Sequence, residues 1–472
     1  MAGPLVSVII PTYNGASFLG RAMRSVLEQT YANFELIVVD DQSPDDTGEV
    51  VRRFDDARIK YIRHEVNQGA STARVTGCRH SSGEIVAFLD QDDFFHPEKL
   101  EAHVEFLRDH PEVGFSYNPY FELVHSSDAI RTVAQPPQNV SLTDLTLGFY
   151  LPPSSWVVRR EWTVVEDVWD YRAVLRGREI VICGRLFMAG CKFGRVDRVL
   201  HYRGYHGRRH VKNLEKNCND EIACQEIVFS DLHCPADVSG MRPVANAAIH
   251  AMWSNVAFTQ NETTLGRNFL WGAGQALSFL FFGNPSPYMS FLMGYCVDDE
   301  SYDYETLLDL VFTQLPIEIP EALSGYLWAV ARGNFVRGIR ALIWNRPEDA
   351  AQYLARGGER GFQVDDASVK QVAYELQGYE LAYGVDATLK KLAVILPALR
   401  KYLGRGGANW LSAGYLFNLA SRTYGRGILR RVPGYIFRAV TVHPRYLADR
   451  GVVSLLLKSI LGIKPVGNGY TG

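Results

Sequence analysis

Short apolar runs and amphipathic stretches alternate along the first hundred residues of the chain. Runs of four or five apolar residues, rich in Val and Ile and bounded by polar residues, predict buried strands. They occur at residues 6–10, 36–39, 59–62 and 85–89. Apolar residues at helical spacing predict helices at residues 18–27, 69–80 and 97–109, and Ser43 could cap another short helix.

This alternation of strands and helices predicts a doubly wound, mostly parallel sheet with helices on both faces. Such sheets bind ligands beyond the carboxyl ends of their strands, where the strand order reverses. The polar residues that directly follow each predicted strand are therefore the first candidates for a functional site.

The hydrophobic pattern changes further along the chain. Short strands are predicted at residues 156–158 and 193–196 and a helix at 179–189, whereas helical stretches dominate past residue 215. We therefore expect an α/β domain at residues 1–215, a helical connecting region at 216–300, and an α-helical domain at 301–472 that ends in a basic amphipathic segment.

Composition excludes several classes of protein. Apolar residues make up 47% of the chain and charged residues 21%, with a net charge of −3; this favours a globular protein and argues against a nucleic-acid binder, which needs a basic excess. Seven cysteines without a CxxC spacing favour reduced thiols in a cytoplasmic protein over disulfides or a zinc site.

No targeting or membrane-spanning segment is expected. The N-terminus lacks the basic and apolar regions of a signal peptide. The most apolar stretch, residues 269–282, is interrupted by Gly272, Gly274 and Gln275 and is shorter than the roughly 20 residues that span a bilayer.

The strongest chemical signal is the acidic loop Asp90-Gln91-Asp92-Asp93, directly after the predicted strand at 85–89. Crowded carboxylates repel one another unless a cation lies among them. Mg²⁺ and Mn²⁺ prefer such oxygen ligands and commonly share them with phosphates. A solvated acidic loop that precedes a helix is the alternative explanation for these residues.

Three further polar clusters follow the other predicted strands. Pro11-Thr12-Tyr13-Asn14 could flank a nucleobase, and Asp40 and Asp41 could accept hydrogen bonds from a base or a ribose. The third cluster, Asn67-Gln-Gly69-Ala-Ser-Thr-Ala-Arg74, offers a glycine for close approach and an arginine for a ribose or phosphate. Turns, a helix start and a surface ion pair are the structural alternatives.

Together these clusters, in this order and spacing, resemble family-two glycosyltransferases of the GT-A fold, over about residues 5 to 205. The resemblance implies that Pro11, Tyr13 and Asp41 contact the nucleoside of a UDP-linked donor sugar, with Asp41 facing the uracil edge, and that Arg74 lies near the nucleotide. It also implies that Asp90 and Asp92, with Asp93 adjoining them, bind Mg²⁺ or Mn²⁺ and the diphosphate. Reaction in that family inverts configuration by a single displacement.

The catalytic base is where the chain departs from this family. Relatives carry Glu-Asp at the start of a helix that ends Arg-Leu-x-x-Ala-Gly. The end matches at residues 185–190, but the dipeptide here is Arg178-Glu179. Glu179 is therefore the expected base, with Asp167 and Asp170 in reserve; a first-turn acid that only interacts with the helix dipole is the alternative role.

Two other family features bear on the reaction. Tyr202-Arg203-Gly-Tyr-His206 resembles the family's Tyr-Arg-x-His element, which implies that Arg203 contacts the donor and that His206 reaches the metal or the diphosphate. One residue is inserted here, so either Arg203 or His206 could be displaced, and a surface histidine is the alternative. The chain has no Arg-Trp pair of the kind found in processive synthases. We therefore expect a single transfer to a glycan or lipid-linked acceptor.

The segment from about Arg400 to residue 472 is strongly basic. It holds twelve Lys or Arg residues interleaved with large apolar ones and very few acids. Basic amphipathic helices suit an anionic membrane surface, so peripheral docking at the inner face of the cytoplasmic membrane is one hypothesis. A helical core with a solvated basic face is the other.

Two other functions are compatible with parts of this pattern. A nucleotide-sugar binding or assembly protein with impaired catalysis would explain the altered Arg178-Glu179 dipeptide. A nucleotidyltransferase would share the sheet and the acidic ligands, but it would need a glycine-rich basic loop where Pro11-Thr-Tyr-Asn14 stands.

Overall fold

A computed structural model describes residues 3–124, 127–147, 151–164, 178–204, 212–277, 285–300, 302–315 and 322–465. The chain divides into two compact units, Met1–Gly325 and Tyr326–Gly472. The three-part division at residues 215 and 300 stays a prediction of how the chain is organised.

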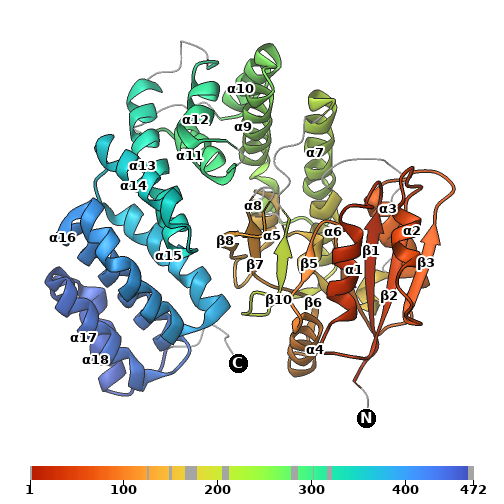
Figure 1. The fold of residues 1–472 in the computed structure, drawn as a ribbon, viewed down its shortest axis with the longest axis horizontal. Coiled ribbons are helices and arrows are strands. Elements are labelled where there is room, and N and C mark those ends of the chain that lie inside the picture. The colour runs from red at the N-terminus through yellow and green to blue at the C-terminus, as the bar shows by residue number, and fades with distance from the viewer. Residues whose placement is uncertain are drawn as a thin grey trace. The chain divides into compact units, whose positions relative to one another are not determined.

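The first unit is built on a seven-stranded sheet with the strand order β10-β6-β9-β4-β1-β2-β3 (Figure 1). β1 to β4 are parallel, as predicted, and β9 runs antiparallel to β4 and β6. The strand order reverses between β1 and β4, so a ligand site is expected at their carboxyl ends. The strands are β1 (Val6–Thr12), β2 (Phe34–Asp40), β3 (Ile59–Arg63), β4 (Ile85–Phe88), β6 (Val113–Tyr117), β9 (Val157–Arg159) and β10 (Lys192–Arg195).

Alternate residues of the central strands enter two separate cores. Val6, Val8 and Ile10 of β1 pack on one face, and Ile9 packs on the other. The first core includes residues of α1 (Leu19–Leu27), α2 (Thr47–Arg52) and α4 (Lys99–Asp109). The second includes residues of α3 (Ala70–His80) and α6 (Arg178–Met188). Helices on both faces confirm the doubly wound prediction.

Two predicted helix starts differ from the structure. α4 begins at Lys99, two residues after the expected Pro97. Ser43 does not cap α2, which begins at Thr47; its hydroxyl accepts a hydrogen bond from the backbone N–H of Asn14 instead. A smaller sheet, with the order β5-β11-β7-β8, was not expected from the sequence. Its strands are β5 (Phe94–Phe95), β7 (Tyr120–Leu123), β8 (Ile130–Ala134) and β11 (His201–Arg203).

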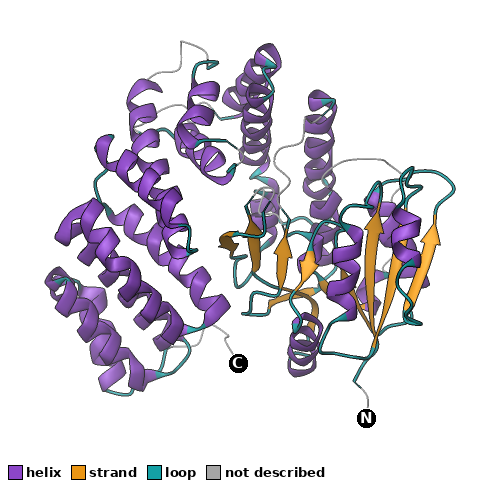
Figure 2. Ribbon diagram, in the orientation of Figure 1, coloured by secondary structure: helices purple, strands orange, loops and turns teal. Residues whose placement is uncertain are grey.

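The rest of the first unit is mainly helical (Figure 2). All seven cysteines are free thiols, and all except Cys234 are buried. The remaining helices of this unit are α5 (Leu142–Thr146), η1 (Pro153–Ser155), η2 (Arg160–Thr163), α7 (Leu214–Phe229), α8 (Ala236–Ser239), α9 (Arg242–Thr259), α10 (Thr263–Ala276), α11 (Pro287–Asp298) and α12 (Tyr304–Phe312).

The second unit is helical in the residues that are described. α16 consists of two helical stretches that meet at Gly404, whose φ of 70° breaks the helix. No helix in the described ranges is both long and apolar enough to cross a membrane. From α13 onward the helices are α13 (Ala322–Ile343), α14 (Pro347–Glu359), α15 (Asp366–Tyr383), α16 (Val385–Gly425), η4 (Leu429–Arg431), α17 (Val432–Val442), η5 (Pro444–Ala448) and α18 (Arg450–Ile460).

Candidate active site

A cavity of about 240 Å³ lies beyond the carboxyl ends of β1, β2 and β4. Eight of its nine lining residues are candidates from the sequence, and Ala70 is the ninth. The four polar clusters therefore meet at one edge of the sheet, as expected. The lining residues are Pro11, Thr12, Tyr13, Asp41, Ala70, Arg74, Asp90, Gln91 and Asp92.

Asp41 is fixed by hydrogen bonds from the start of α3. Its carboxylate is 1% exposed and accepts from the backbone N–H groups of Gln68 at 2.9 Å and Gly69 at 2.6 Å. His64 Nδ1 lies 2.7 Å from the same carboxylate. These contacts hold one carboxylate in a set orientation at the cavity wall before any ligand arrives.

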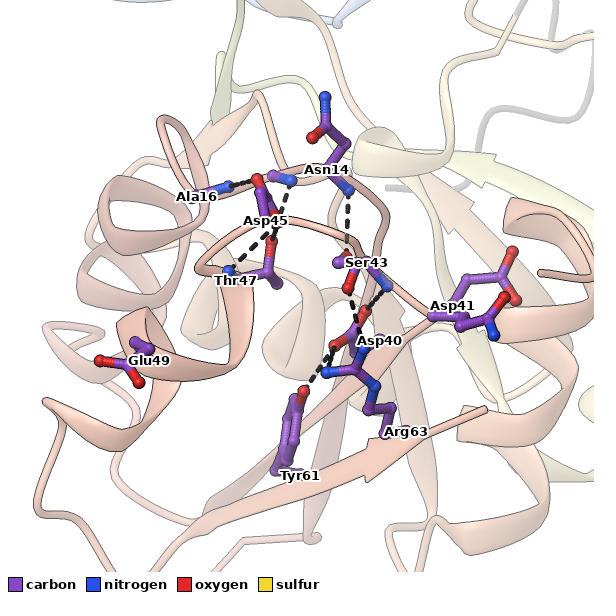
Figure 3. Close-up of polar contacts among 12 residues, drawn as sticks. Asn14, Ala16, Asp40, Asp41, Ser43, Asp45, Thr47, Glu49, Tyr61 and Arg63 are labelled. Carbon is purple, nitrogen blue, oxygen red and sulfur yellow. Dashed lines mark hydrogen bonds and ion pairs between the residues drawn. The ribbon is translucent and has the colours of Figure 1, made fainter. Parts of the chain in front are cut away.

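Asp40 serves the fold rather than the cavity. Its buried carboxylate accepts hydrogen bonds from the Ser43 backbone N–H at 2.7 Å and from the Tyr61 hydroxyl. Figure 3 shows Asp40 directed toward Ser43 and Tyr61, whereas Asp41 points away from this group. Successive residues at a strand end face opposite sides, so the two neighbouring acids separate.

Gln91 joins the end of β1 to the acidic loop. Its Oε1 accepts from the Thr12 hydroxyl at 2.6 Å and from the Tyr13 N–H at 3.0 Å, and its Nε2 donates to the Tyr13 carbonyl at 3.2 Å. Gly15 leaves room for this side chain, because a Cβ there would overlap Gln91 Oε1 and Thr12 Oγ1. Gln91 therefore fixes the spacing between the two sides of the cavity.

Gly15→Ala is expected to displace Gln91 and to weaken the nucleotide binding that the family resemblance implies by about tenfold, because hydrogen bonds worth about 1 kcal/mol each would be lost. Calorimetric titration with UDP would measure the effect. Gly20→Ala, on α1, is the matched control, since a Cβ there would meet Val50 at an ordinary 3.5 Å. Equal affinities for both variants would contradict the role of Gln91.

The three acids of the loop do not all face the cavity. Asp90 and Asp92 line it, but Asp93 is buried and accepts hydrogen bonds from the Ser154 hydroxyl at 2.5 Å and the Gly204 N–H at 3.0 Å. Ser154 also accepts from the Asp90 N–H at 3.0 Å. Ser154 thus fixes the loop from behind.

Burial and mutual repulsion act on these carboxylates. Burial raises the pKa of Asp90. The positive charge of Arg74 lowers this pKa, whereas the negative charges of Asp92 and Glu179 raise it further. Burial, with Asp92 and Asp90, raises the pKa of Asp93 well above its ordinary value. A cation bound at this loop would offset the repulsion among the carboxylates and favour their charged forms.

Arg74 lies between two acids from different parts of the chain. Its side chain is 5% exposed; Nη2 lies 2.7 Å from Asp90 Oδ1, and Nη1 lies 3.2 Å from Glu179 Oε1. The start of α6 is thereby brought to the acidic loop. The expected base and an expected metal ligand share one guanidinium group.

Several other expected site residues hold the loops or lie elsewhere. The backbone N–H of Asn14 donates to the Ser43 hydroxyl, and that of Gly69 donates to the Asp41 carboxylate. The side chain of Asn67 donates to the Asp41 carbonyl. Arg203, on β11, lies 3.7 Å from Glu122. None of these four lines the cavity. Asp167, Asp170 and His206 lie outside the described residues.

Two carboxylates of the cavity are potential ligands of a divalent ion. In the part of the chain that the structure describes, no three His, Cys, Asp or Glu side chains are grouped to hold a metal. Asp90 and Asp92 nevertheless offer hard carboxylate oxygens in one cavity. Two carboxylates, completed by phosphate oxygens and water, suit Mg²⁺ or Mn²⁺.

Sequence reasoning missed His64 and Ser154. His64 follows β3 at the same sheet edge and bridges Asp41 and Thr76, with Nε2 2.9 Å from the Thr76 hydroxyl. Its place after a predicted strand was an available signal. Ser154 lies in η1, 61 residues from Asp93 along the chain, and no local pattern indicates that contact.

The chain is similar to known glycosyltransferases. Residues 7–163 match the model of glycosyl transferase family 2. Two relatives, WfgD and WfaP from Escherichia coli, are named UDP-Glc:α-D-GlcNAc-diphosphoundecaprenol β-1,3-glucosyltransferases. WfgD is 39% identical over 132 residues, which are 28% of this chain and 51% of the relative. WfaP is 37% identical over 117 residues, 25% and 46% of the two chains.

The chain therefore spans about half the length of these relatives. Among solved structures, S. aureus TarS residues 1–349 in complex with UDP-GlcNAc align over 79% of this chain and 90% of theirs, at 16% identity and a TM-score of 0.42. The N-terminal part of the chain, residues 7–163, is a family-two glycosyltransferase domain.

Proposed function

We propose that this chain is an inverting glycosyltransferase that moves a sugar from a nucleoside diphosphate, UDP in the first instance, to a hydroxyl acceptor. One observation carries the proposal. Asp41, Arg74, Asp90 and Asp92 line one cavity where the strand order reverses, inside a domain that matches the family model.

The nucleoside would bind beside Pro11, Tyr13 and Asp41. Tyr13 is about half exposed, so its ring is available to a base, and Asp41 is already oriented by three neighbours. The printed names of WfgD and WfaP specify UDP-glucose as the donor of those proteins, which supports UDP as the first donor base to test here.

The diphosphate would lie toward the acidic loop and Arg74. Asp90 and Asp92 are the residues that would hold Mg²⁺ or Mn²⁺, and the ion would stabilise negative charge on the leaving group. Arg74 supplies a fixed positive charge on the same side. Arginine binds phosphate oxygens through a planar pair of donors.

Glu179 would act as the general base. Its carboxylate would take the proton of the acceptor hydroxyl while that oxygen attacks the anomeric carbon and the bond to the diphosphate breaks. Attack opposite the leaving group inverts the configuration. Glu179 lies within 3.2 Å of Arg74 and is partly exposed, at 19%, which leaves it open to an acceptor.

The acceptor is proposed to be a glycan or a lipid-linked sugar. WfgD and WfaP are named for a GlcNAc-diphosphoundecaprenol acceptor. A single transfer, rather than polymerisation, is proposed because the sequence has no Arg-Trp pair of the kind found in processive synthases.

A panel of nucleotide sugars, tested by thermal unfolding with and without Mn²⁺, addresses the donor. Binding stabilises the native state by about 2.7 kcal/mol at a ligand concentration 100-fold above Kd. We expect UDP sugars to raise Tm in the presence of Mn²⁺. Absence of any shift with all nucleotides would refute the proposal.

A binding protein without activity is the second candidate. The contact of Glu179 with Arg74 favours it, because a carboxylate oxygen engaged by the guanidinium group is not free to accept a proton from an acceptor hydroxyl. Release of free sugar from the stabilising donor, or its transfer to an acceptor, separates the two. A protein that binds UDP but releases no sugar would fit the second candidate.

A further inference from the structure

The outer face of α18 carries an apolar stripe in the basic end of the chain. Val453, Leu457, Ile460 and Leu461 are between 40% and 70% exposed. At about 100° per residue, these four positions share an arc of about 100° on the helix. Val452, Leu455 and Leu456 pack against α16 and α17 in one core. α18 is therefore apolar on two faces, one of which is exposed to solvent.

Basic side chains accompany the exposed stripe. Arg450, Val453, Leu457, Lys458, Leu461 and Ile463 line one groove of about 410 Å³. Residues 400–472 contain twelve Lys or Arg residues and a single acid, Asp449. Asp449 caps α18, because its Oδ1 accepts from the Gly451 and Val452 N–H groups.

The exposed apolar side chains of this segment favour membrane docking over a helical core with a solvated basic face. A helical core with a solvated basic face would place its large apolar side chains inward. Leu455 and Leu456 follow that expectation. Leu457 and Leu461, at 53% and 70% exposure, do not, and neither does Phe437 of α17, at 74%.

We propose that this exposed face of α18, with Arg450 and Lys458 beside it, docks on an anionic lipid bilayer. Apolar side chains enter the boundary between headgroups and acyl chains, and basic side chains remain at the phosphates. Nucleic acid would use the basic residues but would have no role for the leucines. The inference does not depend on the proposed transfer reaction, although a lipid-linked acceptor would lie in the same surface.

Flotation of the full chain with vesicles tests the proposal. We expect binding to phosphatidylglycerol-containing vesicles, weaker binding to pure phosphatidylcholine, and a decrease as salt is raised. The double variant Leu457→Gln/Leu461→Gln should bind at least tenfold more weakly. Val394→Gln, on α16, is the matched control, since Val394 is 73% exposed outside this face.

Unfolding temperatures of all variants would show that exposed positions were changed without loss of the fold. Arg450→Gln/Lys458→Gln provides a second test and should weaken binding to anionic vesicles alone. Failure of the intact chain to float would overturn the proposal. So would full binding by Leu457→Gln/Leu461→Gln, because basic residues alone would then account for attraction to any polyanion.

Discussion

Glu179→Gln is expected to lower kcat by about 10²–10⁴-fold, the usual contribution of a general base. Gln keeps an oxygen that can accept the hydrogen bond of Arg74, which is 3.2 Å away in the native protein, so donor binding should change little. Single-turnover transfer and UDP titration on the same preparation would separate the two effects.

A pH profile distinguishes a base from a residue that only positions Arg74. Loss of a base removes the acidic limb of the kcat profile, whereas a positioning defect lowers the rate at every pH. Glu49→Gln is the matched control, since Glu49 is exposed on α2 and paired with Arg52. Near-normal turnover in Glu179→Gln would disprove the assignment and direct attention to Asp167 and Asp170.

Asp92→Asn should remove the metal dependence of donor binding. Two carboxylates of the acidic loop, Asp90 and Asp92, line the cavity, and the substitution replaces one of them with a neutral amide. A divalent ion prefers charged oxygen ligands. We expect at least a 10²-fold loss of kcat/KM, which is about 2.7 kcal/mol of transition-state stabilisation. Tm with UDP, measured with Mn²⁺ and with chelator, gives an independent readout.

Asp109→Asn is the control for this second substitution, because Asp109 is exposed at the end of α4 and 2.9 Å from Arg108. The chelated wild type should behave like Asp92→Asn. If UDP stabilises the chelated wild type as strongly as the metal-loaded protein, the cavity binds nucleotide without an ion and the metal assignment fails.

The sheet and its ligand edge could be predicted because they depend on local pattern. β1 to β4 each follow from a short apolar run, and a parallel sheet brings their carboxyl ends together. The smaller sheet could not be predicted, because its two- to five-residue strands come from separate parts of the chain. β11 pairs with β5 and β7, which are distant from it in the sequence, and no local sequence pattern indicates such pairing.

In the site, too, some side-chain positions follow from local rules and others depend on contacts between distant residues. The residue types alone do not distinguish Asp40 from Asp41, and only the family resemblance selects Asp41. Alternation along the strand separates the two acids, and that rule can be applied to the sequence alone. Asp93 turns to Ser154 through a contact between distant residues, which no local rule gives. The proximity of Glu179 to Arg74 likewise depends on how α6 packs.

The contacts of Asp41 also bear on how a pyrophosphate can be held in this fold. Many nucleotide-binding sheets receive phosphate at a helix start, where unpaired amides and the dipole favour an anion. Here the Asp41 carboxylate already occupies the start of α3, where it accepts hydrogen bonds from the backbone N–H groups of Gln68 and Gly69. A phosphate in that position would lie beside the Asp41 carboxylate. Under the proposed function, charge on the leaving group would instead be balanced by Arg74 and an external cation, and turnover would then depend on the ionic composition of the medium.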